Sequence, residues 1–171
     1  SHNNGMPYQT IGNLVVNWPG HDQFSDYNRT LNLSNAVHQV DYTSNGVEYQ
    51  RQSLAAFGSR AMVHHYTANA AESVNFDLAF NSEQPHQLTI KDQTLVISGS
   101  GEDHEGVAGQ IRFTTLVKPV LNGGTVTVND SGLSVRGATA LLSISRQPQT
   151  LSISTISVQT TKLLPGKICA R

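Results

Sequence analysis

The 171-residue chain has little of several features that would point to a particular class of protein. Its only cysteine is Cys169, so no disulfide forms within the chain, and cysteine usage neither demands nor forbids export. Aromatic residues make up 6% of the chain, and 11 basic against 12 acidic side chains leave a formal net charge of -1. Neither sign forms a long run, which argues against a nucleic-acid partner. Apolar runs are far shorter than a membrane span, so we expect a soluble chain with no membrane partner.

The sequence does contain many short stretches in which apolar and polar residues alternate, as in β-strands. In the first of them Leu14, Val16 and Trp18 share one face, which places Trp18 in the core, and Pro19-Gly20 ends the stretch. The strongest turn signal is Asn45-Gly46, because Asn-Gly favours the positive φ angles of a type I′ hairpin. Further strands are expected at Ala61 to Thr67, Val74 to Phe80, Leu88 to Ile90, Leu95 to Ile97, Ile111 to Val117, Val126 to Val128, Leu133 to Val135 and Leu141 to Ile144. With no amphipathic helix pattern between them, these strands predict an all-β antiparallel sandwich.

Two longer segments without alternation are the candidate functional loops, since function on a rigid sandwich usually lies in such loops. The first, Pro19 to Asn28, reads PGHDQFSDYN, and the second, Gly99 to Gly109, reads GSGEDHEGVAG. The side chains we expect at a substrate rim or a domain interface are His21, Asp22, Asp26 and Tyr27 in the first loop and Asp103, His104 and Glu105 in the second.

Neither loop carries a convincing catalytic or metal-binding pattern. Four adjacent residues, Glu102 to Glu105, do not converge on one ion without a special loop, and His64 and His65 point to opposite faces of a strand. Asp22 and Asp26 could act as a carboxylate pair, but no second motif supports contrasting environments for them. A nucleophile elbow and a glycine-rich phosphate loop are both absent from the sequence. We therefore expect no catalytic residue, no metal and no cofactor.

An ordered series of motifs resembles the amino-terminal domain of glycoside hydrolase family 95, the family of α-L-fucosidases and α-L-galactosidases. The motifs are Tyr8-Gln9-Thr10, Pro19-Gly20-His21, Ser25-Asp26-Tyr27-x-Arg29-x-Leu31-x-Leu33, Ala36-Val37, the Tyr42 to Tyr49 hairpin, Asp103-His104-Glu105-Gly106, Gly123-Gly124 and Leu133 to Ala138. The resemblance covers about Met6 to Ile144. It implies a sandwich of the super-sandwich type, found at the amino terminus of glycoside hydrolases whose catalytic carboxylates lie in a separate (α/α)6 barrel.

This resemblance divides the chain into two parts. Residues 1–144 are expected to form the sandwich, without the family's usual leading segment that carries a Gly-Asn-Gly motif. Residues 145–171 match nothing in the family pattern and form an atypical tail. Alternation at Leu151/Ile153 and Ile156/Val158 predicts an added strand in this tail, which would cover a sheet edge left open by the absent segment.

Three hypotheses for function follow, in descending order. The first is a non-catalytic domain of a fucosidase-like hydrolase that packs on the catalytic barrel and shapes the substrate entrance. Its expected partners are this barrel and fucosylated glycans, and the isolated chain is expected to self-associate through the exposed interface. The second is a free-standing carbohydrate-binding module that stacks sugars on Trp18, Phe24 or Tyr27. Exposure of these rings would favour this hypothesis, and burial of Trp18 would remove it. The third is a hydrolase acting through Asp22 and Asp26.

Overall fold

The computed structural model describes residues 10–56, 59, 61–147 and 157–159, and within them all regular structure is β-strand. No helix in this part of the chain is long and apolar enough to cross a membrane. The strands are β1 (Asn13–Asn17), β2 (Ser25–Asn32), β3 (Val37–Ser44), β4 (Val47–Ala56), β5 (Ala61–Ala68), β6 (Val74–Asn81), β7 (His86–Lys91), β8 (Thr94–Ser100), β9 (Arg112–Asn122), β10 (Thr125–Asn129), β11 (Gly132–Gln147) and β12 (Ser157–Gln159).

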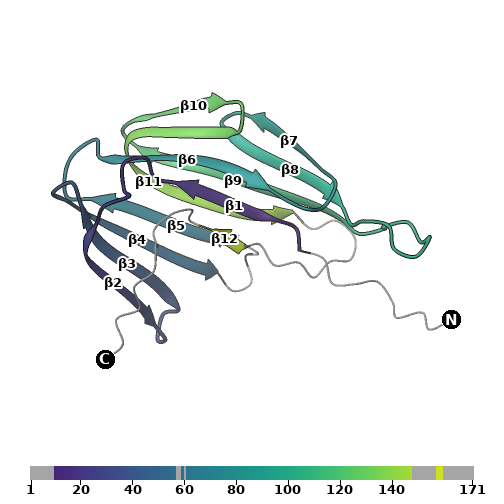
Figure 1. Cartoon of the computed structure of the whole chain (residues 1–171), viewed down its shortest axis with the longest axis horizontal. Helices are drawn as coiled ribbons and strands as arrows, with labels where there is room; N and C mark the ends of the chain where they lie inside the picture. Colours follow the sequence, from purple (N-terminus) through teal and green to yellow (C-terminus); the bar gives the residue numbers. More distant parts are fainter. Residues whose placement is uncertain (1–9, 57–58, 60, 148–156, 160–171) are drawn as a thin grey trace.

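Two sheets share the long strand β11 (Figure 1). Its first half pairs with β6 and β10, in a smaller sheet ordered β12-β1-β6-β11-β10. Its second half pairs with β5 and β9, in a larger sheet ordered β2-β3-β4-β5-β11-β9-β8-β7. The buried apolar side chains of both sheets form one cluster, including Leu14, Phe76 and Leu133 from the smaller sheet and Tyr42, Ile97 and Val117 from the larger. The predicted antiparallel sandwich is therefore confirmed.

The Asn45-Gly46 hairpin is confirmed in detail. Asn45 and Gly46 have φ angles of 51° and 77°, as a type I′ turn requires, and the ladder begins at the Ser44–Val47 pair. The resulting register places Tyr42 opposite Tyr49 on the face that turns toward the core. Trp18, 6% exposed, also lies in the core as the alternation predicts.

The sequence reading of strand boundaries was wrong at two places. Leu133 to Val135 and Leu141 to Ile144, expected as separate strands, are both parts of β11. The strand changes register between Val135 and Ala138 at Gly137, whose φ is +65°, and this bulge lets one strand pass from one sheet to the other. The second error concerns the loop expected from Pro19 to Asn28, because Ser25 to Asn28 already belong to β2. All eight residues of β2 are exposed, so the strand has no buried face to produce an apolar alternation.

Three residues of the tail form a strand at a sheet edge. Residues Ser157 to Gln159 form β12, which pairs in parallel with β1 and covers its outer edge. The other half of the expected pattern, Leu151 to Ile156, lies outside the described residues. Strand β11 continues through Gln147.

Candidate functional site

The first predicted loop is split between core and surface. His21 is 5% exposed and lies among the rings of Trp18, Tyr42 and Tyr49, with its centroid 4.5 Å from that of Tyr49. Asp22 and Asp26 are exposed, and Asp26 accepts a hydrogen bond of 2.7 Å from the Ser25 hydroxyl.

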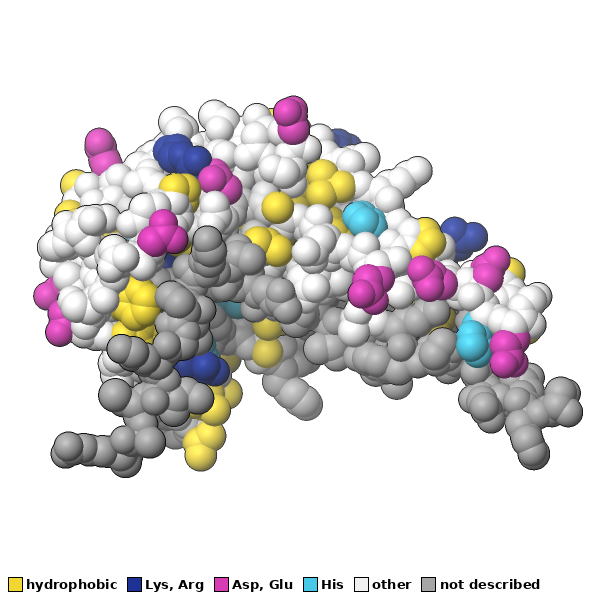
Figure 2. Space-filling view, in the orientation of Figure 1, with side chains coloured by type: hydrophobic (Ala, Val, Ile, Leu, Met, Phe, Trp, Pro, Cys, Tyr) yellow, Lys and Arg dark blue, Asp and Glu magenta, His cyan; other side chains and the backbone are white. Residues whose placement is uncertain are grey.

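The second predicted loop is closed by its own backbone. His104 and Val107 exchange two backbone hydrogen bonds of 2.9 Å, and the Asp103 carboxylate accepts one of 2.9 Å from the Gly109 amide. Glu105, with a φ of 48°, sits at the turn between them. Figure 2 shows acidic side chains and a histidine gathered on this loop, at the end of the molecule away from β2 and β3 in Figure 1. The structure therefore does not bring the two loops together into one site.

The most unusual group near the first loop is a buried cation. Arg51 on β4 is 7% exposed, and its guanidinium lies 4.1 Å from the ring centroid of Trp18 and 4.6 Å from that of Tyr42. The one ion pair among the described residues joins Arg136 to Asp77, so Arg51 has no carboxylate partner there. Cation–π attraction to two rings offsets part of the cost of removing this charge from water. We call Trp18, His21, Tyr42, Tyr49, Arg51 and Tyr66 the Arg51 cluster.

Tyr42 links the polar groups of this cluster. Its hydroxyl accepts a hydrogen bond from Arg51 Nη2 and lies 2.8 Å from His21 Nδ1. Burial, followed by the nearby Arg51 charge, lowers the pKa of His21 to about 4, so the imidazole is neutral near pH 7. Burial also raises the pKa of Tyr42 to about 12, which keeps its proton in place, and raises the pKa of Tyr66. The neutral His21 ring accepts a hydrogen bond from the Tyr42 hydroxyl, while the Tyr42 oxygen accepts one from Arg51. The Tyr42 hydroxyl is thus donor in one hydrogen bond and acceptor in the other.

Replacing Tyr42 with Phe should lower the free energy of unfolding by about 1–3 kcal/mol, because Arg51 and His21 would each lose a buried hydrogen-bond partner. Urea unfolding monitored by Trp18 fluorescence measures the difference. Tyr27→Phe is the matched control, since Tyr27 is 40% exposed. An equal, small loss in both variants would contradict the bridging role of the Tyr42 hydroxyl.

Sequence reasoning missed Arg51, although the signal was present. The hairpin register places Tyr49 on the core face, and Arg51, two residues further along the same strand, faces the same way. A charged residue at an inward position of a predicted strand is the pattern that identifies it.

A shallow hollow of about 460 Å³ lies next to the cluster. It is lined by Asp26, Asp41, Glu48, Gln50 and other residues of β2 to β5. The Asp41 carboxylate is already occupied, because it accepts hydrogen bonds from the side-chain amides of Gln39 at 2.8 and 3.0 Å and of Gln50 at 3.0 Å. No group of three or more His, Cys, Asp or Glu side chains in the described ranges is placed to hold a metal ion.

Comparison with known families identifies the type of domain. Residues 1–147 match the family model described as glycosyl hydrolase family 65, N-terminal domain. The chain belongs to this family of N-terminal domains. No curated protein matches it. The match names family 65, whereas the sequence motifs resemble family 95. Both indicate the amino-terminal domain of a glycoside hydrolase, and the match does not support family 95 itself.

Within this glycoside hydrolase N-terminal domain, the buried polar side chains of the described residues include no carboxylate. Glycosidases use two carboxyl groups held in contrasting environments. The buried polar or charged residues of the described chain are His21, Ser44, Arg51, His64, Gln84 and Thr115, and none is Asp or Glu. Trp18 is buried, and this outcome removes the carbohydrate-binding hypothesis as it was stated from the sequence. Of the other two rings, Phe24 is half-buried and Tyr27 is exposed.

Proposed function

We propose that the chain is the non-catalytic amino-terminal domain of an α-L-fucosidase-type glycoside hydrolase, which packs against an (α/α)6 catalytic barrel and borders its substrate entrance. The family match over residues 1–147 carries the assignment to a glycoside hydrolase N-terminal domain. The fucosidase type depends on the motif resemblance alone. The absence of buried carboxylates from the described core supports the non-catalytic part.

Residues of the motifs that resemble the fucosidase family form hydrogen bonds that stabilise one end of the sandwich, which supports a domain of this type. Pro19-Gly20-His21 forms the corner after β1, where the His21 amide donates to the Trp18 carbonyl at 3.3 Å. The Asn45 amide group of the hairpin donates to the Gly20 carbonyl at 3.0 Å, which ties this corner to the β3–β4 turn. The motif residues thus hold the Arg51 cluster together at one end of the sandwich.

The strand β2 is the surface best suited to a partner domain. It is the edge of the larger sheet and pairs only with β3 among the described strands. Leu31 and Leu33, in and just after it, are 59% and 86% exposed. An edge strand with exposed leucines is normally covered in a native assembly. In this proposal, two groups of side chains meet the barrel or the rim of its substrate site. They are Asp22 before β2 with Asp26 and Tyr27 in β2, and Asp103, His104 and Glu105 at the far end.

The same edge leads us to expect that the purified chain self-associates. Light scattering over a concentration series should show dimers or larger species, and Leu31→Glu together with Leu33→Glu should shift the population toward monomer. Val128→Glu, at a side chain that is 63% exposed on β10, is the control and should leave association unchanged. A chain that stays monomeric at every concentration would count against an interface at this edge.

Catalysis and sugar binding are tested together. We expect no turnover of 4-nitrophenyl α-L-fucoside by the purified chain. In calorimetric titrations with fucose, galactose or fucosylated oligosaccharides, we expect no saturable heat of binding. Binding without turnover would favour the carbohydrate-binding module, and Tyr27→Ala would then locate the site. Turnover that Asp22→Asn or Asp26→Asn abolishes would overturn the non-catalytic assignment.

The fucosidase assignment needs a separate comparison. The chain can be mixed with the catalytic domain of a family 95 α-L-fucosidase and, separately, with that of a family 65 hydrolase. We expect a complex with the first, detectable by analytical ultracentrifugation. A complex with the second alone would keep the domain role but contradict the fucosidase type.

A further inference from the structure

Arg51 is a buried cation to which no acidic side chain of this chain supplies a counter-charge. All 12 acidic residues of the sequence lie within the described ranges, and none of them forms an ion pair with Arg51. Burial lowers the pKa of Arg51, and the groups that raise it are Tyr42, Tyr66 and Tyr27 rather than a carboxylate. Arginine side chains are almost never fully buried without a paired charge. A counter-charge at this position therefore has to come from a bound group.

Two buried N–H groups of the Arg51 cluster have no acceptor among the described residues. They are Nε of Arg51 and Nε1 of Trp18, in side chains that are 7% and 6% exposed. Both groups only donate hydrogen bonds, so their role does not depend on a choice of tautomer. Buried donors without a partner are rare, and a bound water or ion is the usual explanation for one.

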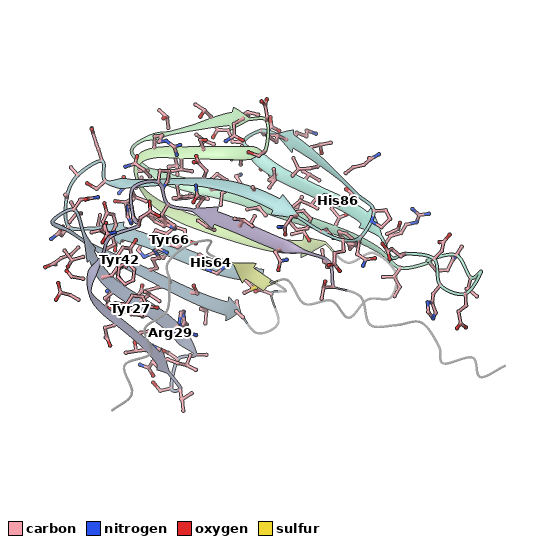
Figure 3. All side chains as sticks on the ribbon, in the orientation of Figure 1. Tyr27, Arg29, Tyr42, His64, Tyr66 and His86 are labelled. Carbon is pink, nitrogen blue, oxygen red and sulfur yellow. The ribbon has the colours of Figure 1, made fainter. Side chains whose placement is uncertain are left out.

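The stacking of Arg51 on Trp18 brings these two donors together. The guanidinium carbon Cζ of Arg51 lies 4.1 Å from the ring centroid of Trp18. Since Nε is bonded directly to Cζ and Nε1 belongs to the Trp18 ring system, the two N–H groups are close neighbours. Figure 3 shows Tyr42 and Tyr66 of the same cluster in the half of the molecule that lies away from the loop between β8 and β9.

The rings around the two donors enclose them. Tyr66, 3% exposed, packs edge-on against Trp18 with the ring centroids 5.1 Å apart. The His21 ring, 5% exposed, has its centroid 5.4 Å from that of Trp18. The Tyr42 ring, 2% exposed, has its centroid 4.6 Å from the Arg51 guanidinium. This enclosure excludes a sugar or a side chain of a partner protein and favours a monatomic ion.

Arg51 carries the single full charge of the cluster near pH 7. Burial, followed by the Arg51 charge, lowers the pKa of His21 to about 4, so that ring is neutral. Burial raises the pKa of Tyr42 to about 12 and also raises that of Tyr66, so both hydroxyls keep their protons. One negative charge is therefore enough to balance the cluster.

We propose that the Arg51 cluster binds a chloride ion, held by the N–H groups of Arg51 Nε and Trp18 Nε1. A halide carries one negative charge and only accepts hydrogen bonds, which matches one cation and two donors. A water molecule would accept from the donors but would leave the Arg51 charge unbalanced. The site is independent of the proposed fucosidase role, because it consists of residues of this chain alone.

Fluorescence of Trp18, the single tryptophan of the chain, tests the site directly. The full chain is titrated with sodium bromide and with sodium iodide at constant ionic strength, with sodium gluconate as the balancing salt. We expect saturable quenching, because a bound heavy halide contacts the indole ring, and recovery of the fluorescence when sodium chloride displaces it. The neutral quencher acrylamide should have little effect, since Trp18 is 6% exposed. No saturable quenching with either halide, or quenching that chloride does not reverse, overturns the proposal.

Urea unfolding provides a second measurement. An ion that binds only the folded chain raises the free energy of unfolding as its concentration rises. Replacing gluconate with chloride at constant ionic strength should therefore raise the urea midpoint of the unmodified chain. An unchanged midpoint is the result expected for a water molecule between the two donors, and it contradicts a chloride site.

Arg51→Met separates the ion from the fold. This substitution removes the charge and the Nε donor, and an apolar side chain of similar length in place of a buried charge is compatible with folding. We expect the halide response to disappear. Arg112→Met, at an exposed arginine on β9, is the matched control and should respond as the unmodified chain does.

Trp18→Phe tests the same site if Arg51→Met does not fold. It keeps an aromatic ring and removes the Nε1 donor, so the affinity for chloride should fall by about tenfold or more. The chloride dependence of urea unfolding, followed by circular dichroism, measures this loss, and the same spectra confirm that each variant is folded. A full halide response in a folded Arg51→Met or Trp18→Phe chain overturns the proposal.

Discussion

Lowering the pH from 7 to 4 should destabilise the domain by several kcal/mol, chiefly through His21 and His64. Burial, with a further contribution from Arg51 for His21 and from His38 for His64, lowers each pKa from 6.5 to about 4. In the unfolded chain both rings regain a pKa near 6.5. Between pH 6.5 and 4 the unfolded state therefore binds more protons than the folded state, so stability falls as the pH falls. The effect is about 3 kcal/mol for each ring, and it levels off below pH 4.

Urea unfolding at pH 7, 6, 5 and 4 measures this loss. His64→Gln should remove roughly half of the pH dependence. His65→Gln is the matched control, because the neighbouring ring points to the opposite face of β5 and is only half-buried. Unchanged stability between pH 7 and 4 would show that neither ring is held neutral by the fold. An equal effect of both substitutions would remove the special role of His64.

Gly132→Ala should strongly destabilise this domain, with a loss of about 3 kcal/mol or more in the free energy of unfolding. Gly132 begins β11 with a φ of +154° and pairs with Ala79 of β6. A Cβ atom there would lie 2.1 Å from the Leu78 carbonyl oxygen. The clash is with the backbone of the paired strand, so no side-chain rotation relieves it.

The hairpin glycine provides the control for this substitution. Gly46 has a φ of +77°, and a Cβ atom added to it would meet nothing within 4 Å. Gly46→Ala should therefore cost only the left-handed backbone strain of about 1–2 kcal/mol. Thermal and urea unfolding of both variants measure the comparison. Similar losses would mean that backbone strain, rather than the close approach of β6 to β11, decides the need for Gly132.

Particular residues show which parts of the fold the sequence pattern predicts and which it does not. The period-two alternation placed Leu14, Val16 and Trp18 on one buried face, because a half-buried strand must show this pattern. The same method failed for Ser25 to Asn28, since an edge strand that is exposed on both faces has no such pattern. It also separated Leu133 to Val135 from Leu141 to Ile144, because the bulge at Gly137 interrupts the alternation within one strand.

The site was less predictable than the fold. Sequence reasoning chose His21 for its place in an irregular loop, but the neighbourhood of Tyr42, Tyr49 and Arg51 that buries it comes from strands more than 20 residues away. It chose the Asp103 to Glu105 loop for its charge, whereas the structure adds that this loop lies at the opposite end from β2. Which loops share an end depends on the order of strands in the sheets, and local patterns do not encode that order.

The sequence by itself determined that this chain is an antiparallel sandwich of the glycoside hydrolase N-terminal type, because alternation and turn residues act locally and the motifs stand in linear order. Only the tertiary structure decided that β11 joins the two sheets and that Arg51 is buried between Trp18 and Tyr42. These are products of strand pairing between distant segments, and the register of that pairing is set by burial of whole faces rather than by any one stretch of sequence.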